Sequence, residues 1–320
     1  MSPTEKFWIN NVSDHGGPNI FSTRLKDELE SRGKIFIKDP FLNQTHFTNL
    51  CAIAGPSFEC ANNVLRLDNL YFDSENPDCN RLNAPIFEAY KRFDHIIFQS
   101  EFSKKMYEAF TGIERPNSVI LNGTSPGFNY NPNPAKEAVS LVRFDKICIT
   151  SAAWRRHKRL EELVSVFSRP ELARTCLLVL GGHEYDNIQQ GDCPKNVVLL
   201  PKVHHTQLPS YYNIADAMVF ISWLDCCPNS VAEALSCGVP VLCSHNGGTK
   251  ELVKDDGIVL QLEDDYEFGT QIPLYNPPKI DEDILLKGVL GILEMDRGFV
   301  REDLSIKSVA DKYEEAFKWA

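Results

Sequence analysis

Residues 222–252 of the chain read SWLDCCPNSVAEALSCGVPVLCSHNGGTKEL, and this is the most informative stretch of the sequence. The apolar run 217–221 just before it predicts a strand, residues 230–236 predict a helix, and the run 239–243 predicts a second strand. Gly238 and Pro240 stand where the helix would close and the second strand would begin. A strand, a helix and a strand in this order are typical of a parallel sheet with helices on its faces.

The loops of this stretch carry groups that suit an anion. Residues 228–230 (Pro-Asn-Ser) would open the helix, whose first amides and positive end form an anion site. Gly247 and Gly248 follow the second strand, where missing side chains let backbone amides approach a ligand. A structural interpretation stays open beside this one. Ser230 and Glu233 have the spacing of a capping box, in which Glu233 only satisfies the helix's first amides, and the glycines would form an ordinary turn.

The same alternation extends outward in both directions. Strand-like runs lie at 6–11, 34–38, 51–54, 64–67, 95–99 and 118–121, with helix-like stretches at 20–31, 83–93 and 103–111. Residues 122–134 hold three prolines, two glycines and four asparagines, a composition typical of a linker. The pattern restarts with strands at 147–151, 175–180 and 197–200 and helices at 159–167 and 208–215, and an amphipathic helix is expected over 306–319. The chain is therefore predicted to form two doubly wound halves, with ligands beyond the carboxyl ends of the strands.

Composition excludes several classes of protein. The formal charge of −11 argues against nucleic acid as a partner, because binding a phosphate backbone needs a basic face. No apolar run is long enough to span a membrane, residues 1–10 lack a signal-peptide core, and the ten cysteines show no zinc-ligand spacing. We therefore expect a cytoplasmic protein with reduced thiols. No dinucleotide glycine fingerprint and no phosphate-loop lysine motif occurs, which disfavours a nicotinamide enzyme or an ATPase.

With these motifs in place, residues 222–252 resemble the signature of the retaining glycosyltransferases of family four, which have the GT-B architecture. That family carries an acidic residue after a strand and a glutamate eight positions later on a helix, which here are Asp225 and Glu233. The usual first acid is glutamate, so the shorter Asp225 is a departure. The resemblance implies that Asp225 contacts the sugar and that Glu233 binds the ribose. It also places the nucleotide-sugar diphosphate or sugar beside five residues: Asn229, Ser230, Val231, Gly247 and Gly248.

A basic run supplies the second match. Residues 151–160 read SAAWRRHKRL and stand where the family places a strand followed by an arginine and a lysine on the donor diphosphate. Lys158 takes the lysine position. The usual arginine position is Ala153, which leaves Arg155 as its candidate substitute. A solvated helix start is the alternative interpretation of this run.

Weaker matches lie in the N-terminal half. Gly16 and Gly17 resemble the family's glycine loop near the transferred sugar, and Asp68 stands at a strand end where many members carry histidine. Asp68 is either a catalytic group that aligns the acceptor hydroxyl or a cap of the next turn. The implied organisation is an acceptor-side Rossmann-like domain over 1–135, with the helix 301–320 packing back on it, and a donor domain over 136–300.

The resemblance implies a glycosyltransferase that moves a sugar from a nucleoside diphosphate, UDP- or GDP-linked, to a hydroxyl of a glycan or other acceptor with retention. No metal ion and no cofactor beyond this co-substrate are expected, and peripheral contact with a membrane is left open. Two alternatives share the architecture: a nucleotide-sugar epimerase, and a non-catalytic protein that binds sugars or nucleotides. Neither the base, the sugar nor the acceptor follows from the residues.

Overall fold

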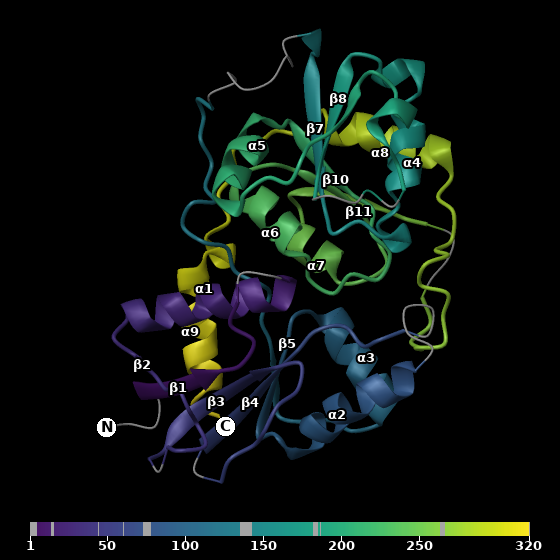
Figure 1. Ribbon diagram of the computed structural model, residues 1–320. Helices are drawn as coiled ribbons and strands as arrows, with labels where there is room; N and C mark the ends of the chain where they lie inside the picture. The colour runs from purple at the N-terminus through teal and green to yellow at the C-terminus, as the bar shows by residue number, and fades with distance from the viewer. Residues whose placement is uncertain are drawn as a thin grey trace.

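The computed structural model describes residues 5–13, 16–43, 45–59, 61–72, 78–134, 143–181, 185, 187–262 and 266–319. It has two lobes, each built on a six-stranded parallel sheet (Figure 1). The predicted pair of doubly wound halves is therefore confirmed. The predicted boundary between residues 135 and 136 lies outside the described residues.

The first lobe has the strand order β2-β1-β3-β4-β5-β6. Its strands are β1 (Lys6–Ile9), β2 (Ile35–Phe36), β3 (Phe47–Ala52), β4 (Ala61–Leu67), β5 (His95–Phe98) and β6 (Asn117–Val119), and its helices are α1 (Gly17–Ser31), α2 (Cys79–Arg92) and α3 (Glu101–Thr111). Because β1 lies between β2 and β3, the strand order reverses at β1, and this reversal opens a crevice at its carboxyl end. Helix α1 begins at Gly17, one turn earlier than predicted.

The second lobe has the order β12-β11-β10-β7-β8-β9. Its elements are β7 (Lys146–Ser151), α4 (Leu160–Val166), β8 (Thr175–Leu180), β9 (Val197–Leu199), α5 (Leu208–Ile214), β10 (Ala217–Phe220), α6 (Asn229–Ser236), β11 (Val241–Ser244), α7 (Thr249–Val253), β12 (Gly257–Leu260) and α8 (Glu282–Ile292). Here the order reverses between β7 and β10, so the crevice of this lobe lies beyond the carboxyl ends of these two strands.

Apolar side chains fill both faces of each sheet. Every residue of β8 is buried, as a central parallel strand requires. Two apolar clusters sandwich each sheet, and the cluster around Tyr90 and Phe98 of the first lobe also takes in Trp223 and Leu224 of the second. The two lobes thus share apolar contacts at their interface.

The last helix, α9 (Ile306–Ala316), belongs to the first lobe although the chain enters it from the second (Figure 1). It packs on α1, and its Val309 and Tyr313 join the cluster formed by Phe21 and Val64. Two hydrogen bonds join Thr124 to the start of α9. The Thr124 amide donates to the Leu304 carbonyl at 2.8 Å, and the Thr124 carbonyl accepts from the Ile306 amide at 2.9 Å.

The stretch 122–134, predicted as a linker from its composition, is partly built into the protein. Asn122, Thr124 and Phe128 are buried, because this segment runs between the two lobes and beside the chain that enters α9. Within the described residues, no helix combines the length and the apolar character that crossing a bilayer requires.

Candidate active site

The crevice of the second lobe brings together Lys158 and Asp225, which lie far apart in the sequence. Lys158 ends a short 3-10 turn after β7, and Asp225 follows β10. Lys158 Nζ and Asp225 Oδ2 are 2.5 Å apart, and both side chains are less than one fifth exposed. Leu224 has a φ of 60°, an uncommon conformation for a side chain of this size. The pair therefore stands at the place where a parallel sheet of this order binds its ligand.

Some of the other side chains of the basic run 155–159 are exposed and others are buried. Arg155 is exposed, whereas His157 is buried, and its ring stacks on Tyr275 with centroids 5.6 Å apart. Burial, with the charges of Lys158 and Arg155, lowers the pKa of His157 to about 2. Arg159 is also buried, and its guanidinium donates to backbone carbonyls. Helix α4 begins only after Arg159, whose φ is 59°, so the run is not simply a solvated helix start.

Helix α6 places Glu233 toward the first lobe. The helix begins at Asn229 with Pro228 as its N-cap residue, so the capping-box interpretation of Ser230 and Glu233 is wrong. The Glu233 carboxylate instead forms a 2.5 Å ion pair with Arg24 of α1. Tyr212 donates to its other oxygen at 3.4 Å. Burial raises the pKa of Glu233, and the Arg24 charge opposes that rise.

The first turn of α6 meets the glycine loop of the first lobe. Asn229 Nδ2 donates to the Gly17 carbonyl at 3.1 Å. Gly16 has a φ of 84°, in the region that favours glycine, and both Gly16 and Gly17 are exposed. The Val231 side chain is buried, and its amide donates to the Pro228 carbonyl at 3.1 Å. The predicted donor positions of both lobes therefore lie next to one another. We call the contact surface between the lobes, which includes Asn229 and Gly17, the seam.

Gly247 and Gly248 form a tight turn that the protein itself requires. The Gly248 amide donates to the Asp225 carbonyl at 2.8 Å, and Gly247 has a φ of 88°. A Cβ atom on Gly248 would lie 2.1 Å from the Cys226 carbonyl oxygen and 2.5 Å from Ser100 Oγ of the first lobe. The turn and the contact between lobes thus explain both glycines without a ligand, and their role toward a diphosphate stays a prediction.

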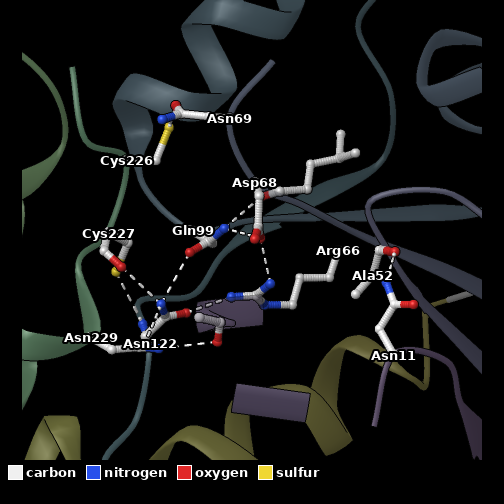
Figure 2. A network of polar contacts seen from close by, with 12 residues as sticks. Asn11, Ala52, Arg66, Asp68, Asn69, Gln99, Asn122, Cys226, Cys227 and Asn229 are labelled. Atoms are coloured by element: carbon white, nitrogen blue, oxygen red, sulfur yellow. Dashed lines mark hydrogen bonds and ion pairs between the residues drawn. The ribbon is translucent and has the colours of Figure 1, made fainter. Parts of the chain in front are cut away.

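Asp68 lies on the first-lobe side of the seam, in a buried polar network (Figure 2). Arg66 Nη1 lies 2.5 Å from Asp68 Oδ1, and the Gln99 amide donates to the same carboxylate. Burial raises the pKa of the Asp68 carboxyl; Arg66 lowers it, and the negative charge of Asp225 raises it further. The neighbouring Asn69 donates to the Leu224 carbonyl at 3.0 Å, so the segments that carry Asp68 and Asp225 are in contact across the lobes.

Asn122 connects this network to the second lobe, as Figure 2 shows. Its Oδ1 accepts from Arg66 Nη2 at 2.7 Å, and its Nδ2 contacts Gln99 Oε1 at 3.1 Å, the Cys227 carbonyl at 2.9 Å and Asn229 Oδ1 at 3.0 Å. A buried amide that joins so many partners fixes the seam in one arrangement.

Sequence reasoning missed several of these residues. The sequence assigned Arg24 no role, and it gave Gln99 and Asn122 only an architectural one, within stretches that resemble the family; their partners lie on other elements of the chain. Glu251 was missed as well: its carboxylate accepts from the first two amides of α3, Glu101 at 2.6 Å and Phe102 at 2.8 Å, across the lobes. A polar side chain just before or within a predicted helix gives no signal of such a partner.

Comparison with known proteins supports the architecture. Residues 135–268, less than half of the chain, match the family model described as glycosyl transferases group 1. No curated protein matches by sequence.

Many solved structures are similar to the chain, and three of them, each matching over nearly its whole length, illustrate the likeness. HepE of Anabaena, in complex with UDP and glucose, has a TM-score of 0.66 at 11% identity over 98% of this chain and 99% of its own. Sucrose-phosphate synthase of Thermosynechococcus elongatus has a TM-score of 0.62 at 15% identity, over 98% and 94%. WaaG, a glycosyltransferase of lipopolysaccharide biosynthesis, has a TM-score of 0.60 at 12% identity, over 98% and 95%.

These likenesses establish that the fold is the GT-B fold, as the sequence predicted. The second lobe holds most of the match to the glycosyl transferases group 1 model, and Lys158, Asp225 and Glu233 all fall inside the matched residues. In the parts of the chain that the structure describes, no group of three or more His, Cys, Asp or Glu side chains is arranged to hold a metal ion. The expectation that the protein needs no metal ion stays a prediction.

Proposed function

We propose that the protein is a glycosyltransferase that moves a sugar from a nucleoside-diphosphate sugar to an acceptor hydroxyl, with retention at the anomeric carbon. One observation carries the proposal: Lys158 and Asp225 pair beside the strand-order reversal of the lobe that holds most of the match to the glycosyl transferases group 1 model, and α6 begins at Asn229, shortly after Asp225 in the sequence. Retention rests on the family resemblance alone. In this proposal residues 136–300 hold the donor, and residues 1–135 with the helix 301–320 hold the acceptor.

The donor would lie along the seam. A departing nucleoside diphosphate gains negative charge in the transition state, and fixed cations and helix-end amides stabilise that charge. We assign this role to Lys158 and Arg155, together with the start of α6 at Asn229 and Ser230. A diphosphate would share Lys158 with Asp225, the carboxylate that lies 2.5 Å away from it.

The sugar and ribose contacts come from both sides of the seam. Glu233 would bind the ribose hydroxyls, and Asp225 and the Gly16-Gly17 loop would position the sugar. Gly247 and Gly248 would hold the loop that carries Asp225, because the Gly248 amide binds the Asp225 carbonyl. Val231 would lie beside the diphosphate while its own amide stays bonded to Pro228.

Asp68 is the proposed group on the acceptor side. It is held by Arg66 and Gln99 at the carboxyl end of β4, and burial keeps the pKa of its carboxyl above the ordinary value. A carboxylate in this position can align an acceptor hydroxyl and accept its proton.

The base of the nucleotide and the location of the protein complete the proposal. HepE of Anabaena was solved with UDP and glucose, which makes UDP the first nucleotide to test. The nine described cysteines are free thiols, which supports the proposal of a reducing, cytoplasmic location.

A thermal-shift screen tests the donor site. UDP, GDP, ADP, TDP and their sugars should include a ligand that raises Tm, because a ligand at 100 times its Kd stabilises by about 2.7 kcal/mol.

Glu233→Ala and Lys158→Ala should weaken binding of that nucleotide while their circular-dichroism spectra match wild type. The donor-site assignment is refuted if both variants keep the wild-type affinity.

Asp68→Asn separates donor binding from transfer. The variant should bind the nucleotide sugar as wild type does and lose transfer by about 100-fold or more, the size of a lost general-base contribution. The assay follows product by NMR, which also reports the anomeric configuration, with and without a chelator to check for metal dependence. An isomerised donor without transfer would instead identify an epimerase, and binding without any turnover would identify a non-catalytic protein.

A further inference from the structure

Helices α1 and α6 of opposite lobes are joined by two polar contacts. Asn229 donates to Gly17 at the start of α1, and one turn further along α6 Glu233 forms its ion pair with Arg24. In Figure 1, α1 lies at the upper edge of the first lobe, below and to the left of α6 of the second lobe. The seam between the lobes therefore passes through the proposed ribose-binding carboxylate.

Arg24 is built into this seam. Its side chain is 8% exposed and that of Glu233 is 7% exposed, so both charges are largely removed from water. The guanidinium also lies 5.5 Å from the centre of the Phe128 ring, and its Nη1 approaches the Gly123 carbonyl at 3.4 Å. A cation held by three different segments is a fixed part of the site and not a mobile surface charge.

The ion pair leaves part of Glu233 available. Arg24 contacts Oε1 at 2.5 Å, whereas among the described residues Oε2 accepts one hydrogen bond, a 3.4 Å contact from the Tyr212 hydroxyl. An ionised carboxylate has about four acceptor positions, so a ribose hydroxyl can bind without displacing Arg24.

The surroundings of Glu233 explain what Arg24 contributes. Burial favours the neutral acid, Arg24 on α1 favours the carboxylate, and Tyr212 on α5 and the more distant His205 act in the same direction as Arg24. Cys237, at the end of α6, also lies within range of the Glu233 charge. Removing Arg24 would leave a buried carboxyl group without its main counter-charge, and a neutral acid is a weaker acceptor for a diol.

We propose that Arg24 is a positioning residue of the donor site. It holds Glu233 as an ionised carboxylate in one orientation for the ribose hydroxyls. Because Arg24 belongs to the first lobe, it makes nucleotide binding on the second lobe depend on contact between the lobes. The inference rests on the proposed function, in which Glu233 binds ribose.

The test compares two forms of one nucleotide. Calorimetry would measure Kd for UDP and for 2′,3′-dideoxy-UDP, and for the GDP pair if GDP is the nucleotide that wild type binds. Wild type should prefer the ribose form by at least about tenfold, as expected for a hydrogen bond to a charged group. Arg24→Gln should bind the two forms within about threefold of each other, and Arg24→Lys should recover part of the preference.

A pH series adds a readout that a purely structural role would not move. The carboxylate is the binding form, so affinity is highest above the Glu233 pKa and falls as the pH drops through it. Losing Arg24 raises that pKa, so the affinity of Arg24→Gln should begin to fall at a higher pH than that of wild type.

Arg32→Gln is the matched control. Arg32 is the C-cap residue of α1 and pairs with Glu28, Asp311 and Glu314 inside the first lobe, so its loss should leave the ribose preference unchanged.

Three outcomes would overturn the inference. Tighter nucleotide binding by Arg24→Gln would mean that Arg24 competes with ribose for Glu233. An unchanged ribose preference in Arg24→Gln, alongside its loss in Glu233→Ala, would reject Arg24 and leave the proposed function standing. Failure of wild type to bind any of the nucleotides would reject the proposed function itself.

Discussion

Gly248 lies between the loop that carries Asp225 and Ser100 of the first lobe. Its missing side chain accommodates both the Cys226 carbonyl oxygen and the Ser100 side chain. The sequence shows a pair of glycines, which suits a ligand-binding loop and an ordinary turn equally well. Only the folded protein reveals that the second glycine is also required by the opposite lobe.

Gly248→Ala should therefore destabilise the protein. The added Cβ would meet the Cys226 oxygen at 2.1 Å, and because that atom belongs to the backbone the turn has to shift. We expect a loss of about 1–3 kcal/mol in the free energy of unfolding, the usual cost of overpacking, measured by urea denaturation. Gly127→Ala is the control, since a Cβ there meets nothing within 4 Å. Equal stability of the two variants would show that the turn yields without cost.

At the scale of elements, hydrophobic runs predicted most of the strands well. Apolar residues at 147–149 in β7 and at 176–180 in β8 each follow a polar residue, so the positions of both strands follow from the hydrophobic pattern. The short elements α7 and β12 were not predicted. Five helical residues at 249–253 and four strand residues at 257–260 are too few to show a period, and they form because β11 offers them an adjacent strand position and a packing surface.

The start of α6 shows where local rules fail. Ser230 and Glu233 have the spacing of a capping box, yet the helix begins one residue earlier and Glu233 bonds to α1. The capping box is a local motif, whereas the Arg24 ion pair joins positions 209 residues apart. A tertiary contact with a buried guanidinium outweighs the local bond, because an unpaired buried carboxylate costs more than an uncapped amide.

The candidate site also contains residues that the sequence identifies and residues that only the docked lobes reveal. Lys158, Asp225 and Glu233 were identified from the resemblance, and strand order explains why residues after β7 and β10 meet. Their partners Arg24, Gln99 and Asn122 depend on how the lobes dock, which no pattern along the chain encodes. Their ligand roles are still predictions, because hydrogen bonds within the protein account for the positions of all six.

At the scale of the whole molecule, the chain crosses between the lobes twice. The first crossing lies after β6, and the second leads from α8 into α9, which completes the core of the first lobe. Thr124 connects the two crossings through its hydrogen bonds to Leu304 and Ile306. The first lobe is therefore incomplete until the end of the chain has been added, and folding of α1 and its sheet depends on residues near 310.

This arrangement predicts that a substitution in the buried face of α9 destabilises elements near the N-terminus, namely β1, β3 and α1. Val309 of α9 and Val166 of α4 are both fully buried, one in the core of each lobe. Val309→Ala and Val166→Ala should each cost about 2 kcal/mol, from two lost methyl groups and the space they leave. Hydrogen exchange distinguishes the variants: Val309→Ala should speed exchange in β1, β3 and α1, and Val166→Ala should speed it in β7 and β8. If Val309→Ala instead affected only residues after 300, α9 would be an appendage of the first lobe that does not complete its core.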